Sequence, residues 1–375
     1  MIIVLRGVMQ ALYAYFSNAI MSYLHFSSAV LFVFILILFI ARCATTQVPR
    51  SIFISFILLV FWLTLSMLVH RMNGFGDYIV YTLPSMVVLS LAQFIRFLHW
   101  KEIGFVALLV FGFQIATLIG DGGFVAIFAR ESRGQLGSLF GHANSFGLIL
   151  SVISICVWFS QYGLRRVTLT TIIFILLLLV GARSVLIAVV ISIGCSLVCS
   201  RWAAKNVAIL LSCMFVASIV VVLAYGMTLV EQDWTEQSIA SGNSLKWRVI
   251  HWAYYLKDLS SMSDWLAGFG LGAHEGVTVG LYDKYYEVHN DYIRIIYDVG
   301  LVGLGLYFAA DYCIFKELSR KCVNSYWFLI SAFWTKWFFM FFDNMVTNMM
   351  TIIGFYLVVM IYVYGVGDER SNSAR

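Results

Sequence analysis

Long apolar runs separated by short polar segments make up most of the chain. A helix needs about 20 apolar residues to cross the hydrocarbon core of a bilayer. Twelve runs come near that length: 2–22, 27–41, 51–69, 77–97, 103–120, 143–161, 167–181, 183–200, 205–226, 291–313, 325–342 and 345–364. This pattern predicts an all-α polytopic membrane protein with about 12 transmembrane helices, organised as a single membrane domain over residues 1–375.

Two of these apolar stretches can each be interpreted in two ways. The run 2–22 begins with a charge, as a signal peptide does, but it lacks a compact apolar core that ends in a small-residue cleavage site. We therefore expect it to remain in the mature protein. The stretch 167–200 is long enough for one bent region, and the charge of Arg183 favours two short spans instead.

The distribution of Lys and Arg predicts the orientation, since cytoplasmic loops are enriched in both. With the N-terminus in the cytoplasm, the inside segments hold fourteen of them and the short outside loops hold four. Both termini are then cytoplasmic, and the long loop 227–290, between spans nine and ten, lies outside. In a bacterium this places the protein in the inner membrane, with the long loop in the periplasm.

Composition narrows the class further. The chain is 62% hydrophobic and 11% charged, whereas soluble domains average about 45–50% and about 25%. These values exclude a water-soluble enzyme and a disordered protein. The net charge of +5 follows from the cytoplasmic loops, so it does not indicate nucleic acid as a partner.

The long outside loop contains a helical pattern. Apolar residues recur at spacings of 4, 3, 4 and 3, which predicts an amphipathic helix at the membrane surface: Leu245, Val249, Trp252, Leu256 and Leu259. Arg248, His251 and Tyr255 form a second face of this helix. Arg248 would either point along the surface toward a ligand or extend toward lipid phosphates.

Histidine and glycine mark the end of the loop. The segment 268–276, GFGLGAHEG, predicts a glycine turn with backbone N–H groups near the membrane surface and an exposed His274. Further on, one helical face would carry a histidine at its outer end and glycines that let another helix approach: His289, Ile293, Ile296, Gly300, Gly303 and Tyr307.

Other charges near the spans suggest ion pairs. Asp291, Arg294 and Asp298 have the spacing of an intrahelical ladder, and Lys336 could reach Asp298 from a neighbouring helix. Arg183 stands on the outer side, against the charge bias of the loops. It either anchors its helix or serves a ligand.

The outer arginines and histidine suggest a chemistry if they converge. Arg183 and Arg248 would offer planar, permanently charged donors to phosphate oxygens. A neutral His289 would accept a proton from a sugar hydroxyl near pH 7. A substrate with an anionic head and a lipid tail fits this site, and a polyprenyl-diphosphate glycan has both. Direct displacement by the hydroxyl would invert the anomeric carbon, and the scheme needs no metal and no cofactor.

Several blocks, in order over roughly 130–310, resemble the O-antigen ligase and polymerase family. They are Gly141-His142-Ala143-Asn144, Gly181-Ala182-Arg183-Ser184, Asn243-Ser244-Leu245-Lys246-Trp247-Arg248, Gly268-Phe269-Gly270-Leu271-Gly272, and His289-Asn290 followed by Gly300 and Gly303. The long outer loop between spans nine and ten fits the same order.

The resemblance implies a glycosyltransferase of the GT-C type. The matched residues would place Arg183 and Arg248 on undecaprenyl diphosphate and make His289 the base. Supporting roles would fall to Asn290, Arg133, His142, Asn144, Gly270 and Gly272. Ala143 departs from the family, which has proline or lysine before the asparagine, and this puts the roles of Arg133, His142 and Asn144 in doubt.

Two reactions of this family use the same donor substrate, the lipid-linked glycan. A polymerase joins O-antigen or exopolysaccharide repeat units on the lipid carrier, and a ligase transfers finished glycan to lipid A-core. The outer loop has eight acids and four bases, a poor surface for a phosphorylated lipid A-core, which favours the polymerase.

Two alternatives come from other classes. A secondary transporter or flippase would be expected to show inverted repeats and broken helices at mid-membrane, and neither is evident. A cell-wall polymerase of the shape-elongation type would be expected to use an outer aspartate where this chain offers His289.

Overall fold

The computed structural model is helical throughout the part of the chain that it describes. The described residues are 35–41, 49–70, 75–91, 143–161, 163–180, 183–198, 209, 213, 244–277, 288–321, 326–343, 345 and 349–373. No strand occurs among them. The predicted spans 2–22 and 103–120 lie outside the described residues, as do most of 27–41 and 205–226.

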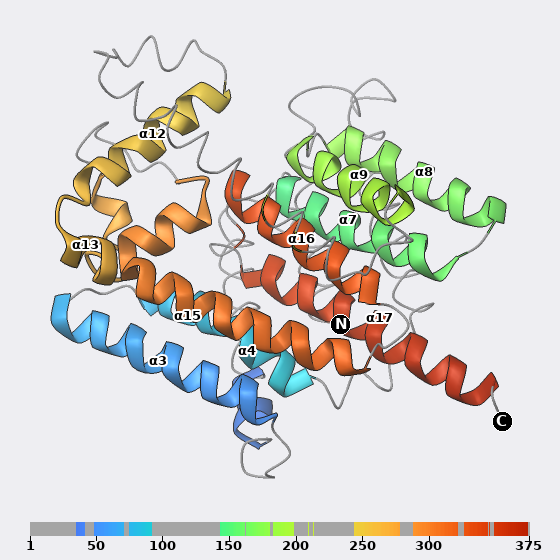
Figure 1. Cartoon of the computed structure of the whole chain (residues 1–375), viewed down its shortest axis with the longest axis horizontal. Helices are drawn as coiled ribbons and strands as arrows, with labels where there is room; N and C mark the ends of the chain where they lie inside the picture. The colour runs from blue at the N-terminus through green and yellow to red at the C-terminus, as the bar shows by residue number, and fades with distance from the viewer. Residues whose placement is uncertain are drawn as a thin grey trace, which may run out of the picture.

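In the described part of the chain, eight long helices form the bundle and two shorter ones lie at one end (Figure 1). The bundle helices are α3 (Arg50–His70), α4 (Phe75–Leu91), α7 (Ala143–Ser160), α8 (Gly163–Val180), α9 (Arg183–Val198), α15 (Asp291–Lys321), α16 (Tyr326–Phe342) and α17 (Met349–Ser373). The shorter ones are α12 (Ser244–Asp258) and α13 (Met262–Ala267). The charge at Arg183 separates α8 from α9, as the sequence predicts.

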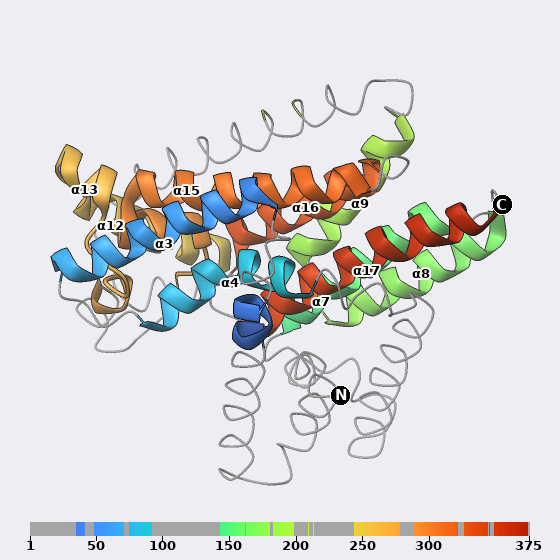
Figure 2. The ribbon, with the colours of Figure 1, turned by 90° about the horizontal axis from the view of Figure 1, so that it is seen from below.

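The helices pack in neighbouring pairs along the bundle. α3 packs on α15, α4 on α17 and α9 on α16, while α7 contacts α8, α9, α16 and α17 (Figures 1 and 2). Their facing sides are almost entirely apolar and make one continuous core. Few polar side chains interrupt this packing, so each buried charge within it needs a specific partner.

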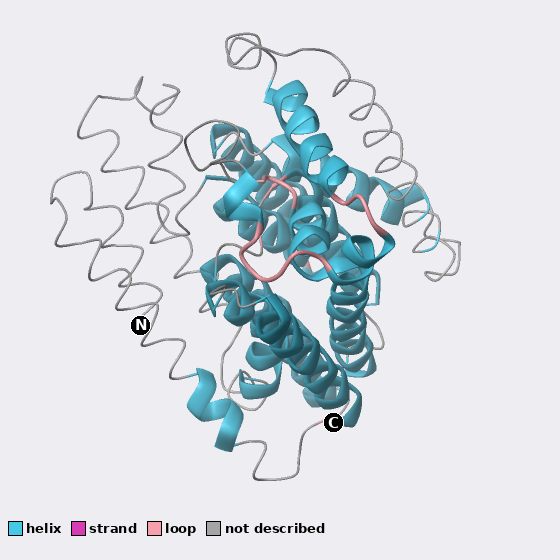
Figure 3. Ribbon diagram, turned by 90° about the vertical axis from the view of Figure 1, so that its left-hand side faces the viewer, coloured by secondary structure: helices cyan, strands magenta, loops and turns pink. Residues whose placement is uncertain are grey.

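One end of the bundle carries α12 and α13, and we call it the loop end. α7, α9 and α17 begin there, and α3 and α16 end there (Figure 1). Figure 3 looks at this end and shows the described loops and turns there in pink. The predicted outer helix coincides with α12, whose residues Val249, Trp252 and Leu256 are buried against the bundle.

Among the helices of the described residues, two, α3 and α15, are long and apolar enough to cross a membrane by length and composition. Outward-facing apolar side chains occur along α3 and α8, among them Phe61 (64% exposed), Leu68 (72%) and Leu164 (82%). Water-soluble monomers seldom expose apolar surface of this extent. The described structure is thus compatible with an α-helical membrane protein.

Helix α15 breaks at Gly300, where φ is 72° and ψ is −178°. The ribbon changes direction there, so the segment 291–299 and the segment 301–321 are separate helical pieces (Figure 1). The prediction of one continuous face from His289 to Tyr307 is therefore wrong. His289 precedes the helix, and Gly300 is not helical.

The break exposes three backbone carbonyls, and each receives a donor. Phe269 N donates to Tyr297 O and Gly270 N to Asp298 O, both at 2.8 Å, and Trp62 Nε1 donates to Val299 O at 2.9 Å. A Cβ on Gly300 would lie 2.1 Å from Leu266 O, and one on Gly268 would lie 2.6 Å from Asp298 O. The glycines thus allow close approach of the 266–270 turn, whereas the sequence predicted approach of a helix.

Lys336 lies inside the bundle and pairs with Asp311 at 2.6 Å, so its predicted pairing with Asp298 is wrong. Both side chains are buried. Tyr356 Oη accepts from Lys336 Nζ at 2.6 Å, and Trp337 Nε1 donates to Asp311 at 2.7 Å. These bonds connect α15, α16 and α17 where the surroundings are otherwise apolar.

Candidate functional site

The loop end of α16 is the point where the predicted site residues meet. The last carbonyls of a helix lack partners within the helix and carry partial negative charge. Phe342 O, in the last residue of α16, accepts a hydrogen bond from Arg248 Nη1 at 2.6 Å. This bond joins α12 to α16, and the Nε atom of Arg248 has no protein partner among the described residues.

His289 approaches the same end of α16. Its Nδ1 lies 3.6 Å from Oδ1 of Asp343, just beyond hydrogen-bond range. The His289 side chain is 21% exposed and that of Asp343 is 5% exposed. A carboxylate beside Nδ1 orients an imidazole and leaves Nε2 to exchange the proton. Since catalytic contacts are often loose without substrate, this geometry suits a base.

His289 also has an unusual backbone. Its φ of 50° makes it the one non-glycine residue with positive φ in the described part of the chain. Such a conformation costs on the order of 1–2 kcal/mol, and strained residues concentrate at functional sites. His289 lies two residues before α15, whose first residue is Asp291.

Asn290 and Asn144 both take structural partners near His289. Asn290 caps α15, because its Oδ1 accepts from Ile293 N at 3.1 Å. Its Nδ2 has no partner among the described residues and remains a free amide donor. Asn144, at the start of α7, donates through Nδ2 to Oδ2 of Asp343. Asp343 is thus shared between α7 and the His289 turn.

Arg183 is the first residue of α9, which packs against α16 and begins at the loop end (Figure 1). Its backbone therefore lies at the same end as Arg248 and His289. The side chain of Arg183 falls outside the described part, as do Arg133 and His142 in full. Their predicted roles stay predictions.

A second histidine, His251, lies on α12 next to this site. It is 1% exposed and stands one turn after Arg248. Burial, and to a smaller extent the nearby His289 imidazole, lowers the pKa of His251 from 6.5 to about 4. His251 is therefore neutral near pH 7, and it adds no positive charge beside His289.

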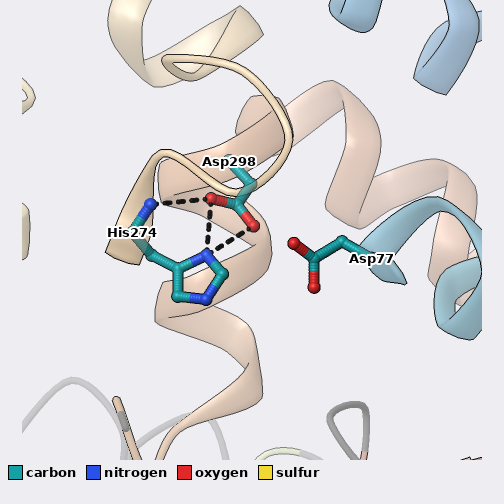
Figure 4. A group of neighbouring side chains, drawn as sticks. All are labelled: Asp77, His274 and Asp298. Atoms are coloured by element: carbon teal, nitrogen blue, oxygen red, sulfur yellow. Dashed lines mark hydrogen bonds and ion pairs between the residues drawn. The ribbon is translucent and has the colours of Figure 1, made fainter. Parts of the chain in front are cut away.

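A further buried cluster lies where α4 meets the first segment of α15 (Figure 4). Nδ1 of His274 is 2.9 Å from both oxygens of Asp298, and His274 N donates to Asp298 Oδ1 at 3.1 Å. Because a carboxylate only accepts, Nδ1 carries the proton. His274 is fully buried, so the prediction of an exposed histidine is wrong.

The same cluster replaces the predicted ladder along α15. Arg294 pairs with Asp77 of α4, and Asp291 accepts from Met345 N at 2.7 Å. Asp298 pairs with His274. The ladder prediction is wrong because the first segment of α15 is surrounded by other elements, and each charge finds its partner outside its own helix.

Asp77, His274 and Asp298 could supply a metal ion with ligand atoms that lie within 4.8 Å of one another. A metal would need Nδ1 of His274 without its proton and the carboxylate oxygens free. Asp77 is paired with Arg294, and Asp298 accepts from His274 and, at 3.1 Å, from Tyr81 Oη. These contacts favour an ion-pair network over a metal site.

The remaining glycines have packing roles. The N–H of Gly270 is used within the protein, and Gly272 O accepts from Glu275 N at 3.2 Å. A Cβ on Gly303 would lie 2.3 Å from the Val299 side chain and 3.2 Å from Trp62 Nε1. The glycine turn therefore directs the N–H groups of Phe269 and Gly270 at α15, and the N–H of Gly268 bonds to Asp264 O.

Sequence reasoning missed Asp343 and the partners of His274. Asp343 lies between two apolar runs, where an isolated acid at the outer boundary was the available signal.

Comparison with protein-family models gives no match, and a search of curated proteins gives none either.

Proposed function

We propose that this protein is a membrane glycosyltransferase that transfers an undecaprenyl-diphosphate-linked glycan to a sugar hydroxyl at the outer face of the bacterial inner membrane. One observation carries the proposal. Arg248 and His289, distant in sequence, contact adjacent residues at the end of α16, namely Phe342 and Asp343. A fixed positive charge and an oriented imidazole therefore lie together at the loop end.

In the proposed reaction the acceptor hydroxyl oxygen attacks the anomeric carbon of the donor. The bond from that carbon to the phosphate oxygen breaks, and undecaprenyl diphosphate leaves with the electron pair. His289 takes the hydroxyl proton, and Asp343 stabilises the imidazolium that forms. Arg248, together with Arg183, stabilises the charge on the diphosphate, and the anomeric configuration inverts.

The wider architecture belongs to the same proposal. The chain would cross the membrane about 12 times, in the manner of GT-C enzymes, with both termini cytoplasmic. The loop end would face the periplasm, which is supported by the excess of Lys and Arg in the segments predicted to lie inside. The lipid-linked donor would then enter from the bilayer beside α12.

The acceptor decides between two reactions. We favour a polymerase that extends O-antigen or exopolysaccharide repeats, because the long outer loop carries eight acids against four bases. Transfer to lipid A-core, the ligase reaction, uses the same donor chemistry and is the alternative. The partners are the lipid-linked oligosaccharide, membrane lipid and the acceptor, which is a glycan for the polymerase and lipid A-core for the ligase.

Deletion of the gene, followed by gel electrophoresis of surface glycan, tests the proposal. A polymerase predicts single-repeat glycans in the deletion strain, whereas a ligase predicts full-length chains that remain on the carrier. The wild-type gene should restore the original pattern. An unchanged pattern in the deletion strain would contradict both forms of the proposal.

A further inference from the structure

The first segment of α15, residues 291–299, begins two residues after His289, with Asn290 between them. Because the helix breaks at Gly300, the long segment 301–321 cannot set the direction of this shorter piece. Its orientation must come from the contacts that surround it. Nine helical residues span about 13 Å, so a change at one end of the piece is carried to the other.

The far end of this piece is held mainly by the turn that contains His274. Phe269 N and Gly270 N bond to the carbonyls of Tyr297 and Asp298. His274 then binds the Asp298 carboxylate through Nδ1 and through its backbone N–H. Tyr255 Oη donates to His274 O at 2.9 Å and fixes the turn to α12.

Each acid of the cluster has its own partner. Two carboxylates, Asp77 and Asp298, face two basic groups, Arg294 and His274, and all four side chains are buried. Removal of the imidazole would leave the Asp298 carboxylate with Tyr81 Oη and the backbone N–H of residue 274 as its donors. A buried carboxylate that loses a partner moves or takes up a proton.

We propose that His274 is a positioning residue, which through Asp298 fixes the 291–299 segment and thereby the His289 turn. The catalytic consequence of this inference rests on the proposed function, whereas the structural role of His274 does not. Nδ1 is the atom that acts, and Nε2 has no partner in the described structure.

Three variants separate this role from others. His274→Ala removes the contact with Asp298. His274→Asn keeps an amide N–H near the position of Nδ1 and should restore the contact, whereas His274→Gln places its amide near Nε2 and should not. Tyr81→Phe, which removes another bond to the same carboxylate, is the matched control.

Hydrogen–deuterium exchange on the purified full chain tests the structural part. We expect faster amide exchange over 291–299 in the Ala and Gln variants, and exchange close to wild type in the Asn and Phe variants. Unchanged exchange in His274→Ala would overturn the proposal. A divalent cation that copurifies with the wild type and is lost in His274→Ala would also overturn it, since the cluster would then be a metal site.

Kinetics with an undecaprenyl-diphosphate-linked oligosaccharide tests the catalytic part. In monodisperse His274→Ala protein, kcat should fall by up to about 100-fold, since small misplacements of a catalytic group have this effect. The KM for the donor should stay within about threefold of wild type, because Arg248 is unchanged. A merely structural role would leave kcat per folded molecule unchanged. An inactive His274→Asn variant would overturn the proposal and assign the role to Nε2.

The two claims fail separately. If the wild type transfers no glycan, the proposed function is refuted, and the exchange measurement alone decides whether His274 fixes the 291–299 segment. If the wild type is active and the Ala variant keeps its full kcat, the proposed function stands and the positioning role is refuted.

Discussion

At the scale of single residues, Asp343 has the largest predicted effect among those that the sequence did not suggest. Asp343→Asn keeps the size and the bond from Asn144 but removes the charge that stabilises an imidazolium at His289. We expect kcat to fall by about 100-fold, measured as glycan transfer by purified protein. Asp264→Asn, at the exposed cap of α13, is the control and should retain activity. Equal rates in the two variants would refute a role for Asp343.

The guanidinium groups lead to a second prediction. Arg248→Lys loses the planar donor set, of which one Nη1–H binds Phe342 O, and a point charge does not reproduce it. Activity should fall by about tenfold or more, with Arg183→Lys similarly affected. Arg320→Lys, an exposed residue at the opposite end of α15, should behave as wild type. Full activity of Arg183→Lys would show that Arg183 only anchors α9.

Sequence patterns identify some of these residues and not others. Arg248 and His289 stand out because each belongs to a spacing pattern that the sequence itself displays. Asp343 does not, since its meaning depends on His289, which is distant in sequence and comes near only through the packing of α16. His274 was misjudged for the same reason, because its partner Asp298 lies 24 residues further along the chain.

At the scale of elements, the break in α15 governs the arrangement of the loop end. Gly300 has a positive φ, and a Cβ there would lie 2.1 Å from Leu266 O. Gly300→Ala should destabilise the protein by on the order of 3 kcal/mol, from the left-handed backbone and the overpacking together. Thermal unfolding in detergent measures this loss.

Gly305 offers the matched control for this prediction. It lies in the same helix, and a Cβ there would meet nothing within 4 Å. Gly305→Ala should leave stability unchanged or raise it slightly. If both alanine variants unfold at the same temperature, the close approach at Gly300 does not affect the stability of the protein.

Apolar runs predict the helices well, because each helix must present an apolar surface to its neighbours or to lipid. They do not predict the break at Gly300. A glycine in an apolar helix is equally suited to close packing and to a change of direction. The choice depends on Leu266 and Ala267, which belong to a different element.

At the scale of the whole molecule, His251 links stability to pH. An unfolded histidine has a pKa near 6.5, and in the fold the pKa of His251 is about 4. The folded protein therefore binds fewer protons, and its stability falls as the pH drops from 6.5 to 4, by up to about 3 kcal/mol. The melting temperature of the wild type should fall between pH 7 and pH 4.5.

The control for this prediction is a comparison of two histidine variants. His251→Asn should flatten the dependence of melting temperature on pH, because the residue that resists protonation is gone. His70→Asn, at the end of α3, should keep the wild-type dependence. The same slope in all three proteins would show that His251 is not buried as described.

Composition and charge distribution predict an α-helical membrane protein, and the described bundle is compatible with this prediction. The relation of α12 to α16 could not be predicted, because it depends on the bond from Arg248 to a backbone carbonyl. Carbonyl positions follow from the fold and have no signal in the side-chain pattern.

The most direct test of the account uses purified protein and an undecaprenyl-diphosphate-linked oligosaccharide, with release of undecaprenyl diphosphate as the measured quantity. The account predicts that the wild type releases it as the glycan is transferred, and that His289→Ala releases none while it remains folded and inserted in the membrane. Release by His289→Ala at the wild-type rate, or no release by the wild type, would contradict the account.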